Sequence, residues 1–196
     1  MTAATLPGTC RTVLKEWATV LEAMGRGEQV VLIRKGGVIE PGSGFELRAE
    51  TFIFSPTFEH QAVAFLREPF RAYFEAAAAR RAPAGQLRFE LAGRVAWSTR
   101  TTDAGCVPRL AAAHIYNEAF VAQRLKWQPD QPLAVVAVRV YRLAAPVQVP
   151  AAPSYAGCTS WVELEAEVPL IGATPVMDDA RFAQKLHEVK TVFGQS

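Results

Sequence analysis

Apolar residues near the N-terminus recur at the spacing of an amphipathic helix. Between Thr9 and Met24 they return every three or four positions, so that they would share one helical face. Gly25 and Gly27 follow at the point where a helix would end, because glycine readily adopts the conformation that closes a helix. The pattern predicts a helix over residues 9–24.

The next segment has the pattern of strands joined by a tight turn. Residues 28–35 contain a run of aliphatic side chains typical of a strand, and Gly36 with Gly37 allows the positive φ angles of a two-residue hairpin turn. Short apolar runs over residues 45–48 and 51–54 predict two further strands. This part of the chain is therefore expected to form hairpin-linked strands.

The middle of the chain predicts two helix starts and a second hairpin. Ser55 has the character of an N-cap, and Pro56 suits the first position of a helix. A further helix is expected over residues 69–81, which contain a run of alanines. Residues 87–91 and 94–101 each alternate between apolar and polar side chains, so we expect two strands with a turn between them.

The last third predicts a central strand and a capped helix. A helix is expected to end before Pro129, and the apolar run Leu133 to Val138 is typical of a strand covered on both faces. Residues 161–168 predict the last strand. Asp178 is placed to cap a final helix that reaches about Val192.

Arg139 interrupts the predicted central strand. A buried guanidinium group needs a carboxylate partner, because an uncompensated buried charge costs several kcal/mol. Glu163 and Glu165 lie on the predicted neighbouring strand, so we expect one of them to pair with Arg139.

The order of the predicted elements indicates an α+β fold. Hairpin connections dominate, which favours a mostly antiparallel sheet or a small barrel of the PUA type with flanking helices. Residues 1–196 are expected to form a single domain, since this length suits one domain. Flexible loops are expected near residues 83–86 and 145–156.

Charge and cysteine content narrow the classes of function. The chain has 21 basic and 19 acidic residues, and this near balance argues against an extended DNA-coating surface, so any polyanion contact must be local. Cys10, Cys106 and Cys158 are widely spaced and odd in number, which predicts a reduced protein without a zinc site. Without an apolar run long enough for a membrane span, we expect a cytoplasmic location, no membrane partner and no cofactor.

A candidate anion site combines the basic turn with the predicted helix start. Arg34 and Lys35 would end their strand facing the free N–H groups of a helix that begins at Ser55. The alternative is that the glycines only form a hairpin turn and that the two cations are solvated. The candidate residues for phosphate or nucleic-acid binding are Arg34, Lys35, Gly36, Gly37, His60 and Gln61.

Two further groups of residues are candidates for catalysis. His60 could titrate near neutral pH and act as an acid or base, and Cys158 lies in a predicted turn where a thiol would be accessible. Alternatively, tight packing accounts for the small side chain of Cys158. Glu40 and Glu46 resemble the acidic elements that hold a divalent metal in restriction-type nucleases, although Arg48 stands where such sites have lysine.

Four segments, in order, carry a family resemblance: LKEWATVLEAMGRGEQVVLIRKGGVIE, FIFSPTFEHQ, RLKWQPDQPLAVVAVRVYRL and YAGCTSWVEL. Over residues 14–182 the chain resembles an uncharacterised bacterial family, the domain of unknown function numbered 1802. The resemblance implies a link to DNA restriction and modification, because relatives can be joined to a restriction-endonuclease-like domain. It implies no catalytic residues. The motif positions are Arg34, Lys35, Gly36, Gly37, His60, Gln61, Cys158 and Trp161.

These observations leave three hypotheses open. The first is an accessory domain that binds nucleic acid, a nucleotide or another phosphate-bearing ligand. The second is an enzyme, either a metal-dependent phosphodiesterase or another hydrolase. The third is a module that binds a protein partner through its alanine-rich helix.

Overall fold

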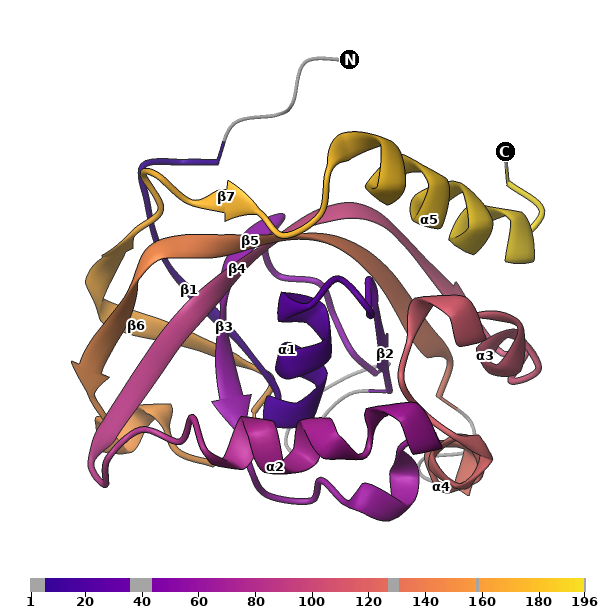
Figure 1. Cartoon of the computed structure of the whole chain (residues 1–196), viewed down its shortest axis with the longest axis horizontal. Coiled ribbons are helices and arrows are strands. Elements are labelled where there is room, and N and C mark those ends of the chain that lie inside the picture. The colour runs from indigo at the N-terminus through magenta and orange to yellow at the C-terminus, as the bar shows by residue number, and fades with distance from the viewer. Residues whose placement is uncertain (1–5, 36–43, 127–130, 158, 196) are drawn as a thin grey trace.

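The computed structural model describes residues 6–35, 44–126, 131–157 and 159–195 (Figure 1). These residues form an α+β fold on a seven-stranded sheet. The strands are β1 (Thr9–Trp17), β2 (Val31–Arg34), β3 (Thr51–Thr57), β4 (Gln86–Thr101), β5 (Leu133–Pro150), β6 (Trp161–Pro169) and β7 (Thr174–Pro175). The α-helices are α1 (Ala18–Gly25), α2 (Ala72–Ala78), α3 (Cys106–Arg109), α4 (Glu118–Lys126) and α5 (Asp179–Val192). Single 3₁₀ turns are η1 (Val63–Phe65), η2 (Glu68–Phe70), η3 (Ala111–Ala113) and η4 (Pro153–Tyr155).

The sheet is mixed, with antiparallel pairs in the majority. Its strand order is β2-β5-β4-β3-β1-β6, and β7 pairs with β5. Only β1 and β3, among the described pairs, run parallel. The predicted α+β fold with a mostly antiparallel sheet is therefore confirmed.

The sheet curves around α1 and has a hydrophobic core on each face. Figure 1 shows α1 inside the curve, α2 beside it, and α5 on the opposite side of β5. Leu14 and Phe52 belong to the larger core, whereas Val13 and Ile53 belong to a smaller one. Because successive residues of a strand point to opposite faces, β1 and β3 are buried on both sides.

This double burial explains why the helix predicted over residues 9–24 is wrong in its first half. Val13 and Leu14 are adjacent and both buried, as in a helix, but they point into different cores. Residues 9–17 form β1, and the helix begins only at Ala18.

The helix start predicted at Ser55 is also wrong. Ser55 and Pro56 lie in β3, opposite Lys15 and Glu16 of the parallel strand β1. Pairing of β3 with β4 reaches only Ile53, so Pro56, which has no N–H to donate, lies beyond it. The strand predicted at residues 45–48 is likewise absent from the described structure.

The second predicted hairpin is one continuous strand. Gly93 lies in the middle of β4, where a Cβ atom would approach Phe52, Phe54 and Val138 to 2.8 Å. The glycine is needed for this close packing, and no turn forms there. Residues 145–150, expected in a loop, belong to β5, and residues 147–150 pair with residues 86–89; their flexibility stays a prediction.

The C-terminal helix α5 has the predicted cap. The Asp178 carboxylate accepts a hydrogen bond from the backbone N–H of Arg181 at 2.8 Å. Arg139 is almost fully buried and pairs with Asp179 at 2.5 Å, so the partners predicted on β6 are wrong. This pair ties α5 to β5. None of the described helices is long and apolar enough to cross a membrane.

Replacing Gly93 by alanine should destabilise the fold, because the added methyl group would overlap two phenyl rings and a valine. We expect the free energy of unfolding, measured by urea denaturation, to fall by about 1–3 kcal/mol. Gly8→Ala is the matched control, since its Cβ would have no neighbour nearer than 3.9 Å. Equal stability of the two variants would contradict this packing.

His114 is a buried histidine that remains neutral. Its Nδ1 atom accepts the backbone N–H of Tyr116 at 3.1 Å, so Nε2 carries the proton and donates to the carbonyl of Val107 at 2.8 Å. Burial, together with the charge of Arg67, lowers the pKa of His114 to about 4. The unfolded chain takes up this proton near pH 6.5, whereas the folded chain does so only near pH 4.

Stability should therefore fall as the pH drops from about 6.5 to about 4, since the unfolded state binds the proton first. The contribution of His114 should be at most about 3 kcal/mol. Urea denaturation of the parent and of His114→Gln, at several pH values in this window, measures it. The parent should lose more stability than the variant on acidification; parallel pH profiles would refute the assignment.

Candidate functional site

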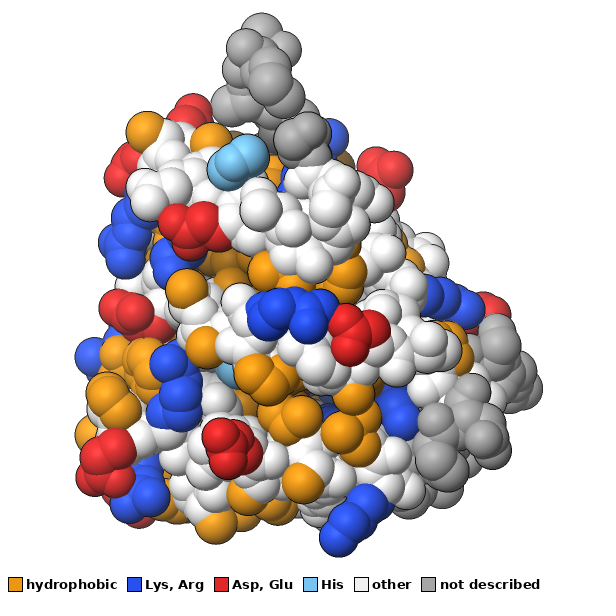
Figure 2. Space-filling view, turned by 90° about the vertical axis from the view of Figure 1, so that its right-hand side faces the viewer, with side chains coloured by type: hydrophobic (Ala, Val, Ile, Leu, Met, Phe, Trp, Pro, Cys, Tyr) orange, Lys and Arg blue, Asp and Glu red, His pale blue; other side chains and the backbone are white. Residues whose placement is uncertain are grey.

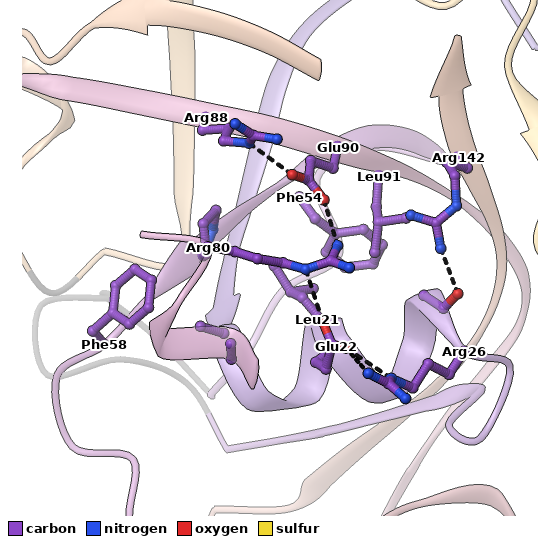
Figure 3. Close-up of a pocket in the computed structure, with 14 residues that line it drawn as sticks. Leu21, Glu22, Arg26, Phe54, Phe58, Arg80, Arg88, Glu90, Leu91 and Arg142 are labelled. Atoms are coloured by element: carbon purple, nitrogen blue, oxygen red, sulfur yellow. Dashed lines mark hydrogen bonds and ion pairs between the residues drawn. The ribbon is translucent and has the colours of Figure 1, made fainter. Parts of the chain in front are cut away.

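A cavity of about 190 Å³ opens beside α1, between α2 and strands β3 and β4 (Figure 3). One face of α1 lines it, through residues spaced three or four apart such as Ala18, Leu21 and Gly25. The cavity gathers six charged residues from α1, the end of α2, β4 and β5. They are Glu22, Arg26, Arg80, Arg88, Glu90 and Arg142.

Glu22 is the most buried charge of this group, with 6% of its side chain exposed. Its Oε1 atom accepts a hydrogen bond from Nε of Arg26 at 2.7 Å, and Nε of Arg80 lies 3.5 Å from Oε2. The charge and hydrogen bond of Glu22 raise the pKa of Arg26. The two guanidinium groups thus compensate a carboxylate that burial alone would destabilise.

Arg80 extends this network to β4. Its Nη1 atom lies 2.9 Å from Oε2 of Glu90, whose Oε1 accepts a hydrogen bond from Nε of Arg88 at 2.7 Å. The register of β4 with β5 shifts between Phe89 and Leu91. Such a bulge changes the direction of side chains, and both Glu90 and Leu91 line the cavity.

Arg142 approaches the cavity from β5. Its Nη2 atom donates a hydrogen bond to the carbonyl of Gly25, at the C-terminal end of α1, at 2.6 Å (Figure 3). This position suits a cation, because the C-terminal end of a helix carries partial negative charge. Among the described residues, Arg142 has no carboxylate partner, and Arg88 donates only through Nε.

The remaining wall of the cavity is apolar. Leu21, Phe54 and Leu91 line the cavity with apolar side chains among the charged groups. Phe58 lies at the edge, with the guanidinium group of Arg81 stacked 4.2 Å from its ring centroid. A ligand in this cavity would meet guanidinium N–H groups as well as hydrocarbon.

The structure gives Arg34 partners within the fold. Its Nη1 atom lies 2.9 Å from Glu16 and 3.1 Å from the carbonyl of Lys15, and Nη2 donates to Ser160 at 2.7 Å. These contacts join the end of β2 to β1 and to the start of β6. Its neighbour Lys35 is 3% exposed.

Gln61 and His60 have different surroundings. The Gln61 side chain accepts hydrogen bonds from the N–H of Thr19 at 3.2 Å and from its hydroxyl at 3.0 Å. Gln61 therefore caps α1 from outside the helix. His60 is exposed and has a φ angle of 63°. Arg34 thus contacts the end of β1, and Gln61 contacts the start of α1.

The structure describes only some of the remaining residues that the sequence predicted for a site. Gly36, Gly37, Glu40 and Cys158 lie outside the described residues. The Glu46 side chain is exposed, while its carbonyl accepts a hydrogen bond from the indole of Trp161 at 2.9 Å. No group of three or more histidine, cysteine, aspartate or glutamate side chains suited to a metal occurs in the described part of the chain.

The charged residues of the cavity were missed because they are far apart in the sequence. Arg26 and Arg142 are separated by most of the chain, and no motif joins them. The sequence contains one indication that charged residues meet here. Glu22 falls within the apolar stretch read as a helix, and a carboxylate there requires cationic partners.

Replacing Glu22 by glutamine should weaken the contact between α1 and α2. We expect a loss of about 1–3 kcal/mol in the free energy of unfolding, because two guanidinium groups lose their carboxylate. Glu68→Gln is the control, since Glu68 is 78% exposed and its pair with Arg71 lies at the surface.

A double-mutant cycle with Arg80→Gln tests the contact itself. Arg80→Gln should cost less in the Glu22→Gln background than in the parent, as expected for interacting side chains. Additive effects would mean that Glu22 and Arg80 do not interact.

The family comparison gives a match over nearly the whole chain. A family model with the description Domain of unknown function (DUF1802) matches residues 13–188. This match confirms the resemblance found from the sequence motifs. No curated protein and no solved structure matches the chain.

Proposed function

The chain belongs to the family described as Domain of unknown function (DUF1802), and we propose that it binds a phosphate-bearing ligand in the cavity beside α1. The observation that carries the proposal is the charge of the cavity, where four arginines meet only two glutamates. Guanidinium groups match the geometry of phosphate oxygens and can bind them through paired hydrogen bonds.

The arginines of the cavity have different roles in this proposal. Arg26 and Arg80 hold Glu22 in place. Arg88 and Arg142 keep N–H groups that are not donated to any described group, and these would bind the phosphate. The proposed ligand is still phosphate-bearing, as predicted from the sequence. The proposed binding site is the cavity beside α1 and no longer includes Arg34.

The size of the cavity favours a small ligand, such as the phosphate end of one nucleotide. Its volume of about 190 Å³ is below the roughly 300–1,000 Å³ of typical small-molecule sites. A phosphate with a ring system near the partly exposed Phe58, at the edge of the cavity, fits this space better than a duplex does. The link to DNA restriction that the family resemblance implies would make a phosphorylated strand end one source of such a nucleotide.

The distribution of surface charge supports a local site. On the face that carries α3, α4 and the end of α5, lysine and arginine side chains lie scattered among acidic and hydrophobic ones (Figure 2). The cavity, in contrast, has two positive charges more than it has negative ones. This excess equals the formal net charge of the whole chain, +2.

Calorimetric titration with adenosine monophosphate tests the proposal. Adenosine should bind far more weakly, because it lacks the phosphate that Arg88 and Arg142 would contact. The double variant Arg88→Gln, Arg142→Gln should lose roughly 100-fold in affinity, at about tenfold for each charged hydrogen-bonding group. Arg109→Gln, which removes an exposed arginine of α3 outside the cavity, should bind as the parent does.

An oligonucleotide with and without a 5′-phosphate distinguishes the two sources of ligand. Binding that requires the 5′-phosphate would identify strand ends as ligands, and binding of the monophosphate alone would indicate a free nucleotide. Equal binding of adenosine and its monophosphate, or unchanged affinity in the double variant, would overturn the proposal.

A further inference from the structure

Another arginine whose N–H groups are not donated to a described residue is Arg124, which lies outside the cavity in the last turn of α4. The guanidinium group of Arg124 packs 5.2 Å from the ring centroid of Phe120 and 5.8 Å from that of Trp17. Stacking satisfies the flat face of a guanidinium group but leaves its five N–H donors at the edge. Arg124 donates none of them to a described residue.

Glu16, whose charge acts on Arg124, is already paired within the fold. Oε2 of Glu16 pairs with Arg34 at 2.9 Å, and Oε1 accepts the backbone N–H of Trp17 at 2.7 Å. No carboxylate of the described residues lies within ion-pair distance of Arg124, because Glu16 pairs with Arg34 instead. Burial and the charge of Arg34 lower the pKa of Arg124, as expected for a cation that lacks sufficient negative charge nearby.

The surroundings of Arg124 are fixed by aromatic packing. The rings of Tyr116 and Phe120 stack with centroids 3.7 Å apart, and Trp17 stacks on Phe65 at 6.2 Å. Asn117 anchors the start of α4, because its amide donates to the carbonyl of Ala64 at 2.7 Å. Arg124 is therefore held in position without any ligand, which reduces the entropy that binding would cost.

We propose that Arg124, stacked on Phe120 and Trp17, binds an oxyanion, a phosphate or carboxylate group, at a site separate from the cavity. Such a group would accept the free N–H bonds of Arg124 and supply the negative charge that Glu16 alone does not. None of Arg34, Arg124 and Glu16 lines the cavity, so this site does not depend on the function proposed for it.

Tryptophan fluorescence provides a direct test, because Trp17 lies under the guanidinium group of Arg124. Titration with inorganic phosphate or acetate, at ionic strength held constant with potassium chloride, should give a saturable change in the parent. Arg124→Gln should weaken this binding by about tenfold or more, whereas Arg124→Lys should retain part of it. Saturation by phosphate alone would restrict the site to phosphate, and saturation by both probes would mark a general oxyanion site.

Three controls make the outcome decisive. Trp17→Phe should abolish the fluorescence change, which assigns the signal among the four tryptophans. The double variant Arg88→Gln, Arg142→Gln should leave the change intact, which separates the site from the cavity. Far-ultraviolet circular dichroism verifies that each variant is folded. No saturable change in the parent, or an unchanged titration in folded Arg124→Gln, would overturn the proposal.

Discussion

The cavity depends on one buried carboxylate. Glu22 lies in α1 with 6% of its side chain exposed, and Arg26 and Arg80 both form ion pairs with it. Breaking a buried pair by removing one partner is costly, so this contact fixes α1 against the end of α2. Arg80 then carries the connection to Glu90 on β4. A chain of alternating charges thereby builds one wall of the cavity.

The two ends of α1 are organised differently. At its C-terminal end, Arg142 binds the carbonyl of Gly25 and adds positive charge to the cavity. At its N-terminal end, the Gln61 side chain caps the helix, and the pair of Glu16 with Arg34 ties β1 to β2. Positive charge in excess of negative charge occurs near both ends, and this excess is the basis of the two proposed anion sites.

Much of the fold could be predicted from the sequence, because several elements depend on local patterns. The strand around Leu133 follows from its apolar run, and the cap at Asp178 from its position before an amphipathic helix. The strand at residues 9–17 could not be recognised, since burial on both faces gives it adjacent apolar residues. The sequence predicts a turn at Gly93 because its tight packing depends on residues from two distant strands, Phe52 and Phe54 of β3 and Val138 of β5.

The candidate site was less predictable than the fold. Its charged residues come from α1, the end of α2, β4 and β5, and only the folded chain brings them together. The sequence marks Arg34 as a candidate site residue, but its ion pair with Glu16 forms only because the fold brings the end of β1 to the end of β2.

The central claim is that the cavity beside α1 binds a phosphate-bearing ligand. A crystal structure of the protein crystallised with adenosine monophosphate tests this claim most directly. The account predicts a phosphate within hydrogen-bonding distance of Arg88 and Arg142, with the ring system near Phe58 at the edge of the cavity. A nucleotide bound elsewhere, or a cavity without ligand at a saturating concentration, would contradict it.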